Sequence, residues 1–243
     1  MNGKVYLVGL GPGPKEYITQ DAVDAVGKCD VFITPDDARP VIESLVPDKY
    51  IITRKMSPVD RSLLAVSYAE QGTNVCIPSI GHPGFYAIAS TFFDVLGDKK
   101  LDVEVIPGMT SLDYAAARLG SPLGRDYAVV SLADQASPWE EINERAEKAL
   151  SADLVLTIYN PIGKIGDERL HKIIDYANGI HKCVVGLLIS TAVGEEKIIV
   201  TDTESFPYDE VTRYTIVIIG NSYTENKNGR MITPRPYLSG KGY

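Results

Sequence analysis

The feature that most constrains the fold is an alternation of short apolar runs with longer segments of helical spacing. Several runs are rich in β-branched residues and apolar at consecutive positions. This pattern is typical of strands covered on both faces, as in a parallel sheet with helices above and below it. The runs cover residues 5–10, 31–34, 75–78, 103–106, 128–132, 154–159, 184–189, 197–201 and 214–219.

The segments between these runs predict helices. They cover residues 18–28, 59–71, 86–96, 111–119, 138–150 and 167–177. The clearest is 138–150, where Ser137 is a candidate cap and Pro138 suits the first helical position. Glu140 and Glu141 follow in the first turn, where negative charge is favourable.

The order of these elements predicts two α/β domains. Strands and helices alternate as far as residue 106, which favours a largely parallel first sheet. The runs 197–201 and 214–219 follow one another with hardly any helix between them, which favours a mixed second sheet with hairpin-like pairs. A length of 243 residues lies between the usual sizes of one and two domains. We therefore predict domains over residues 1–112 and 113–243.

Charge and cysteine content narrow the classes of function. Lys plus Arg is 24 and Asp plus Glu is 32, so the net charge of −8 argues against a generally basic nucleic-acid binder. No stretch reaches the roughly 20 apolar residues of a membrane span, and the first apolar run is too short for a signal peptide. Cys29, Cys76 and Cys183 are far apart and form no metal-ligand cluster, so we expect core thiols, no bound metal and a cytoplasmic location.

A glycine-rich segment, GLGPGP at residues 9–14, follows the first predicted strand. Its position suggests a dinucleotide loop, with Asp36 or Asp37 as the ribose-binding acid. However, a phosphate cradle needs backbone N–H groups, which Pro12 and Pro14 lack, and the spacing is GxGxG rather than GxGxxG. The segment suits a ligand that packs against it, or a tight turn with no ligand.

Two further loops follow predicted strands. GHPGFY at residues 81–86 comes after the third run, and IPGMTS at residues 106–111 ends the fourth run. Thr110 or Ser111 can either cap the next helix or hydrogen-bond a ligand. Because open α/β sheets bind ligands at the carboxyl ends of their strands, we predict that the three loops share one ligand.

Taken together, these motifs resemble those of the tetrapyrrole methylases, S-adenosylmethionine-dependent enzymes of corrin and sirohaem synthesis. The resemblance starts with VYLVGLGPGPKEYITQDAVDAVGKCDVFI, continues through GHPGFY and VIPGMTSLDYAAARLG, and covers nearly the whole chain except residues 34–56. The C-terminal series is similar to that of the precorrin-3B or cobalt-factor III C-17-methyltransferases. It consists of DYAVVSLADQASPWEEI, DLVLTIYNP, TIVIIGNS and RMITPRPY.

This resemblance implies a class III S-adenosylmethionine-dependent methyltransferase fold, with the donor bound between the domains and S-adenosylhomocysteine as product. It also implies a homodimer. The implied donor contacts are Pro12, Gly81, His82, Phe85, Thr110, Ser111, Tyr159, Asn160, Thr191, Ala192 and Thr233.

Two departures bear on the substrate. His82 stands where the family has the aspartate of a GDP motif, and residues 190–196 lack the arginine-containing stretch usual in this branch. A corrinoid substrate carries many carboxylates, which arginine and lysine bind well. The cations in or near predicted loops are Arg39, Arg54, Lys55, Arg61, Arg125 and Lys164. Of these we predict Arg39, Arg54 and Lys164, together with Gly11, as substrate contacts.

The resulting hypothesis is methylation of C-17 of precorrin-3B or cobalt-factor III, linked to ring contraction. The sequence does not identify a catalytic acid or base; Ser131, Asp134 and Tyr159 stay open. The same motifs are compatible with methylation at another corrin position, with methylation of a protein side chain as in the diphthine synthases, and with a non-catalytic donor-binding protein. A dinucleotide-dependent dehydrogenase also stays open.

Overall fold

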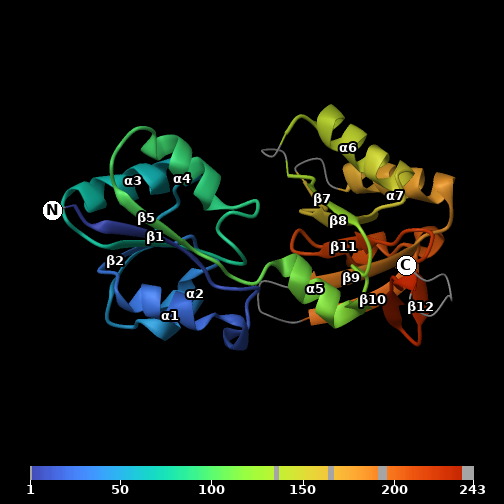
Figure 1. Cartoon of the computed structure of the whole chain (residues 1–243), viewed down its shortest axis with the longest axis horizontal. Coiled ribbons are helices and arrows are strands. Elements are labelled where there is room, and N and C mark those ends of the chain that lie inside the picture. The colour runs from blue at the N-terminus through green and yellow to red at the C-terminus, as the bar shows by residue number, and fades with distance from the viewer. Residues whose placement is uncertain (1, 134–136, 164–166, 191–195, 237–243) are drawn as a thin grey trace. The chain divides into compact units, whose positions relative to one another are not determined.

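A computed structural model describes residues 2–133, 137–163, 167–190 and 196–236 (Figure 1). The chain divides into two compact units, Met1–Ser111 and Leu112–Tyr243. Each unit contains a sheet with helices packed on it, so the predicted α/β class is confirmed.

The first unit contains a five-stranded parallel sheet in the order β3-β2-β4-β1-β5. This confirms the parallel first sheet expected from the consecutive apolar runs. The strands are β1 (Lys4–Gly9), β2 (Val31–Ile33), β3 (Tyr50–Ile52), β4 (Val75–Ser79) and β5 (Asp102–Ile106).

Helices cover both faces of this sheet: α3 and α4 lie on one face and α1 and α2 on the other (Figure 1). Along β2, Ile33 belongs to the core under α3 and α4, whereas Phe32 points into the core under α1 and α2. Alternate side chains are thus buried on opposite faces, which explains the unbroken apolar run. The helical segments are a 3₁₀ turn (Lys15–Tyr17), α1 (Gln20–Gly27), α2 (Arg39–Leu45), α3 (Pro58–Glu70) and α4 (Ile88–Leu96).

Two elements of this unit, α2 and β3, were not predicted. Helix α2 has seven residues, of which only Ile42 is buried, and β3 lies at the sheet edge with no fully buried residue. Neither therefore carries the apolar periodicity that marks the others. The helix predicted over 86–96 begins at Ile88 instead, because Tyr86 has a φ of 52°, which is incompatible with an α-helix.

The second unit contains a mixed sheet in the order β10-β9-β11-β8-β7, which confirms the mixed second sheet. Strands β7 and β8 are parallel, whereas β11 is antiparallel to both β8 and β9, and β10 is antiparallel to β9. The strands are β7 (Tyr127–Ser131), β8 (Val155–Tyr159), β9 (Val184–Ser190), β10 (Glu196–Asp202) and β11 (Ile216–Ile219). A separate small sheet joins β6 (Gly120–Ser121), β12 (Glu225–Lys227) and β13 (Arg230–Ile232).

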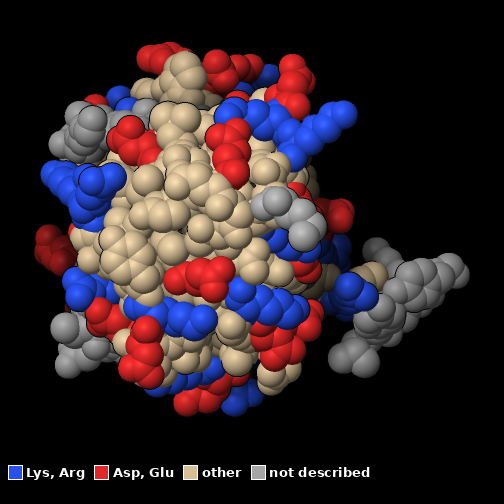
Figure 2. Space-filling model, turned by 90° about the vertical axis from the view of Figure 1, so that its left-hand side faces the viewer, with Lys and Arg blue, Asp and Glu red and all other residues tan. Residues whose placement is uncertain are grey.

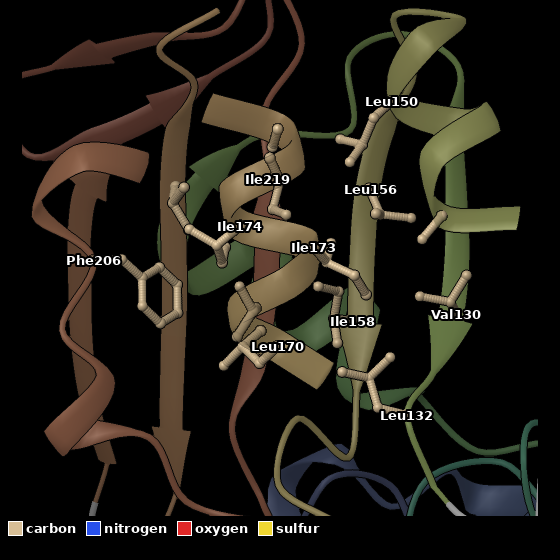
Figure 3. Close-up of a cluster of buried hydrophobic side chains, with 14 of the residues drawn as sticks. Val130, Leu132, Leu150, Leu156, Ile158, Leu170, Ile173, Ile174, Phe206 and Ile219 are labelled. Atoms are coloured by element: carbon tan, nitrogen blue, oxygen red, sulfur yellow. The ribbon is translucent and has the colours of Figure 1, made fainter. Parts of the chain in front are cut away.

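One face of the mixed sheet packs against helices α6 and α7 (Figure 3). Leu170, Ile173 and Ile174 of α7 are fully buried against strand residues such as Leu156 and Ile158 of β8. On the other face, Gly186 of β9 lies against Leu119 and Met231, and a Cβ there would be 2.8 Å from Leu119. The remaining helical segments are α5 (Ser111–Leu119), α6 (Trp139–Ser151), α7 (Glu168–Ile180) and two 3₁₀ turns, Thr203–Ser205 and Tyr208–Glu210.

The predicted start of α6 was wrong in detail. Ser137 does not cap the helix; Pro138 occupies the cap position and contributes no side-chain hydrogen bond. The Ser137 hydroxyl instead accepts a hydrogen bond of 3.3 Å from Arg145. Glu140 and Glu141 do lie in the first turn, where their charge favours the helix N-terminus.

Charged side chains of both signs are mixed on the face at the left-hand side of Figure 1, and no extended region of one sign is visible there (Figure 2). Within the described residues, no helix is both long enough and apolar enough to span a membrane.

Candidate functional site

The three glycine loops of the first unit meet backbone to backbone beyond the carboxyl ends of β1, β4 and β5. A Cβ on Gly9 would lie 2.5 Å from the Gly108 nitrogen, and one on Gly108 would lie 2.3 Å from the Gly81 carbonyl oxygen. Gly11 and Gly81 exchange backbone hydrogen bonds of 3.3 and 2.7 Å, and both have a positive φ. Only glycine permits this approach, so these glycines fix the edge of the sheet at which we predicted a ligand.

The GHPGFY loop is held in shape by its own hydrogen bonds. The His82 Nδ1 accepts a bond of 2.9 Å from the Gly84 backbone N–H, and the His82 carbonyl accepts one of 3.1 Å from Phe85. The Nδ1 atom is thus an acceptor here, a role that the aspartate of the family motif can also fill. Phe85 is half-buried and packs edge-on against exposed Tyr86, with ring centroids 5.2 Å apart.

The predicted donor contacts Pro12, Thr110 and Ser111 are half-buried residues of the same loops. Helix α5 begins at Ser111, so its first turn follows directly from the Gly108 loop. The backbone N–H of Leu112 in that turn donates a 2.7 Å hydrogen bond to the Tyr159 hydroxyl. Sequence reasoning gave Tyr159 as a flanking residue and missed this cap, because residues 47 positions apart carry no local signal.

In the second unit, Tyr159 and Asn160 lie at the carboxyl end of β8, beside Ser131 at the end of parallel β7. The Asn160 side-chain amide donates a 2.9 Å bond to the Ser131 hydroxyl, which also accepts a 3.3 Å bond from the Ala133 N–H. Asn160 has a φ of 50°, a conformation in which asparagine is enriched. Ser131 is therefore a positioning partner of Asn160.

Thr233 is elsewhere in the second unit, directly after β13. It is 2% exposed, and its hydroxyl shares a 2.8 Å hydrogen bond with the Thr224 hydroxyl. The following Pro234 carbonyl accepts a 2.9 Å bond from Arg125 Nε. Four residues of interest, Thr191, Ala192, Lys164 and Asp134, lie outside the described residues.

The candidate cations of the substrate site differ in how far they are already engaged. Arg39 Nε lies 2.6 Å from Glu43, and its guanidinium also donates to Thr53. Arg125 stacks on the Tyr223 ring at 3.7 Å in addition to its bond to Pro234. Arg54 is exposed and contacts only the Met56 sulfur, at 3.5 Å, among described hydrogen-bonding groups.

The strongly shifted pKa values lie outside these loops. Burial raises the pKa of the Cys183 thiol to about 11 and that of the Tyr208 hydroxyl to about 12. Both groups stay protonated at neutral pH, so neither is an activated nucleophile or general base. The loops themselves offer backbone groups, hydroxyls and one aromatic ring, a set suited to holding and orienting a ligand.

Comparison with known proteins identifies the family. The family model described as "Tetrapyrrole (Corrin/Porphyrin) Methylases" matches residues 4–206. A cobalt-factor III methyltransferase from Priestia megaterium is 35% identical over 98% of this chain, which spans 46% of that relative. A probable cobalt-factor III C(17)-methyltransferase from Salmonella typhimurium is 32% identical over 95% of this chain and 98% of the relative.

Solved structures agree with this assignment. The crystal structure of the methyltransferase CobJ has a TM-score of 0.86 and 25% identity, over 96% of this chain and all of that one (100%). A uroporphyrin-III C-methyltransferase from Thermus thermophilus, complexed with S-adenosylhomocysteine, has the same fold, with a TM-score of 0.70 and 20% identity over 90% of this chain and 97% of that one. With a family model that matches most of its length and a relative matched almost end to end, the chain belongs to the tetrapyrrole (corrin/porphyrin) methylases.

Proposed function

We propose that this protein transfers a methyl group from S-adenosylmethionine to C-17 of cobalt-factor III or precorrin-3B in cobalamin biosynthesis, in the step linked to ring contraction. The observation that carries this proposal is the similarity, over at least 95% of the chain, to relatives named for that reaction. S-adenosylhomocysteine is then the second product.

The glycine loops fit the proposed donor. When bound, S-adenosylmethionine supplies a methyl group on a positively charged sulfur. Residues 9–14, 81–86 and 107–111 contain no Lys or Arg, so these loops place no permanent positive charge beside it. The hydroxyls of Thr110 and Ser111 supply hydrogen bonds, and the half-buried Phe85 ring supplies a flat apolar surface.

The chain's own contribution to such a transfer is chiefly orientation. Holding two reactants in line accounts for as much as roughly 7–11 kcal/mol of a barrier in the best intramolecular cases, and needs no activated nucleophile. We propose that Pro12, Gly81 and His82 of the first unit and Tyr159, Asn160 and Thr233 of the second contact the donor. Thr191 and Ala192 complete this proposed set, and Gly11, Arg39, Arg54 and Lys164 are proposed to contact the acceptor.

The test is incubation with methyl-labelled S-adenosylmethionine and a panel of tetrapyrroles that includes cobalt-factor III and precorrin-3B. We expect label in the corrinoid, at C-17 by NMR. Label at another carbon would retain the family and change the position. Label on protein alone, as expected for a diphthine-synthase-like enzyme, would contradict the proposal.

Two further outcomes would place the chain in a different functional class. Binding of S-adenosylhomocysteine by calorimetry, without transfer to any tetrapyrrole, would identify a non-catalytic donor-binding protein. Binding of NADH but not of S-adenosylhomocysteine would favour a dehydrogenase. The glycine loops are more compatible with a donor-binding protein than with a dehydrogenase, because Pro12 and Pro14 remove two N–H donors that a pyrophosphate needs.

We also propose a homodimer in the reducing cytoplasm. The three cysteines are buried free thiols, which suits a reducing compartment. Light scattering of the purified chain tests the dimer, with a monomer at micromolar concentration as the contrary result.

A further inference from the structure

Two buried polar groups of the first unit have no partner, and both lie toward the carboxyl end of its sheet. Thr34, directly after β2, is 1% exposed, and its hydroxyl has no hydrogen-bond partner among the described residues. Arg61 lies in the first turn of α3, which follows β3. Its Nε is shielded from solvent and is likewise unpartnered within the described chain.

Such groups are unusual because an unsatisfied buried donor destabilises the free protein. The Arg61 side chain forms no ion pair in the described part of the structure, unlike Arg39 and Arg145, which each bind a glutamate at 2.6 Å. Burial lowers the pKa of Arg61, and the exposed carboxylates Asp37 and Asp36 oppose that shift from beyond ion-pair distance. The guanidinium therefore lies near the segment after β2 with its hydrogen bonds incomplete.

Strand order separates this region from the glycine loops. In the order β3-β2-β4-β1-β5, the three glycine loops follow the adjacent strands β4, β1 and β5. Thr34 and the segment leading into α3 follow β2 and β3, the other half of the same edge. A ligand on the β2–β3 half would thus border a ligand on the glycine half at the β2–β4 junction, as a methyl acceptor must border its donor.

We infer that Arg61 and the Thr34 hydroxyl bind a carboxylate of the tetrapyrrole acceptor, with Arg61 the charged contact. This rests on the proposed function for the identity of the acceptor. A guanidinium supplies the paired N–H donors that match a carboxylate, and a threonine hydroxyl donates one more. The six candidate cations of the sequence are thereby separated, since Arg39 and Arg125 already hold partners in the described structure.

The test is steady-state kinetics of the full-length chain with cobalt-factor III and S-adenosylmethionine. For Arg61→Gln we expect the acceptor KM to rise at least about tenfold, with the donor KM unchanged, because a charge-assisted bond is lost. Arg61→Lys should recover part of the loss by retaining the charge. The control Arg145→Gln removes an exposed arginine of α6 and should leave both KM values unchanged.

Thr34→Val gives a second readout that does not depend on Arg61. It removes a hydroxyl that has no partner in the described structure, so the free protein should be equally stable or more stable in urea, while the acceptor KM rises. A purely structural role for Thr34 would lower stability and leave KM alone. That result, or an unchanged acceptor KM in Arg61→Gln, would overturn the inference.

A binding experiment separates this inference from the proposed reaction. Uroporphyrin III, with eight carboxylates, and its octamethyl ester are titrated into wild type and variants by fluorescence. We expect wild type to bind the acid more tightly than the ester, and Arg61→Gln to lose at least about tenfold of that difference. Equal binding of acid and ester, or an unaffected variant, would overturn the role of Arg61 even if the enzyme methylates corrinoids. An inactive wild type that shows the expected binding would instead refute the proposed reaction.

Discussion

At the scale of single residues, the glycines at the carboxyl edge of the first sheet determine whether the loops can meet. Gly108 is the most constrained, because its missing Cβ would lie 2.3 Å from the Gly81 carbonyl oxygen and 2.8 Å from the Gly9 carbonyl carbon. Both neighbours are backbone atoms, which have no rotamer to adopt. The requirement for glycine therefore comes from packing between loops.

Replacing this glycine tests that packing. Gly108→Ala should lower the free energy of unfolding by about 1–3 kcal/mol, the usual cost of overpacking, because the loops must separate. Gly27→Ala is the matched control: no atom lies within 4 Å of its Cβ position in α1, so no loss is expected. Urea denaturation of both variants measures the difference; equal stability would contradict the contact.

Thr110 tests the proposed donor contacts. Thr110→Val keeps the shape and deletes a hydroxyl, so affinity for S-adenosylhomocysteine should fall by roughly 1–3 kcal/mol if that hydroxyl binds the donor. Isothermal titration calorimetry measures the dissociation constant, with Thr201→Val in β10 as the control. An unchanged constant would reduce Thr110 to a local structural role.

His82 tests the departure from the family motif. Its Nδ1 accepts the Gly84 N–H at 2.9 Å, and a carboxylate can accept the same bond. His82→Asp should therefore retain stability to within about 0.5 kcal/mol, whereas His82→Ala should lose about 0.5–1.5 kcal/mol. Thermal unfolding compares the two, and equal losses would show that the hydrogen bond is unimportant.

At the scale of elements, helix α3 begins with a complete capping box. The Ser57 hydroxyl accepts from the Asp60 N–H at 3.1 Å, and the Asp60 carboxylate accepts from the Ser57 N–H at 3.2 Å and hydroxyl at 2.7 Å. These hydrogen bonds stabilise the ionised carboxylate and lower the pKa of Asp60 from 3.8. The box fixes the first turn, which also carries Arg61.

The capping box gives a prediction with a defined pH dependence. Ser57→Ala should lose about 1 kcal/mol of stability at pH 7. Because the folded-state pKa of Asp60 is lowered, its contribution is present above pH 3.8 and is lost as the pH falls through the folded value. The gap between wild type and variant in urea denaturation should therefore narrow below about pH 4; a gap that widened there would contradict the box.

At the scale of the whole molecule, the proposed donor set draws residues from both units. Saturating S-adenosylhomocysteine at about 100 times its dissociation constant should stabilise the folded chain by about 2.7 kcal/mol. Hydrogen exchange should then slow at residues 81–86 and 110–111 of the first unit and at 159–160 and 233 of the second. Protection confined to one unit would contradict the set, and exchange at the exposed turn 228–229, which the donor should leave unchanged, serves as the reference.

The sequence predicted those elements whose burial is repeated along the chain. The runs 5–10, 75–78 and 154–159 correspond to β1, β4 and β8 because their side chains are buried on both faces. By contrast, α2 and β3 were missed because their residues are largely exposed, and the hairpin β12–β13 because its strands are three residues each. Short elements receive their stability from neighbours, which local sequence does not record.

By itself, then, the sequence determined the α/β class, the parallel and mixed sheets and the family, since periodicity and motif order are local properties of the chain. Only the tertiary structure decided which polar groups are satisfied. It assigned the Tyr159 hydroxyl to the Leu112 N–H, Arg39 to Glu43 and Arg125 to Pro234, and left Thr34 and the Arg61 Nε without partners among the described residues. Such pairings depend on which distant residues folding brings within about 3 Å, a condition that no spacing along the chain specifies.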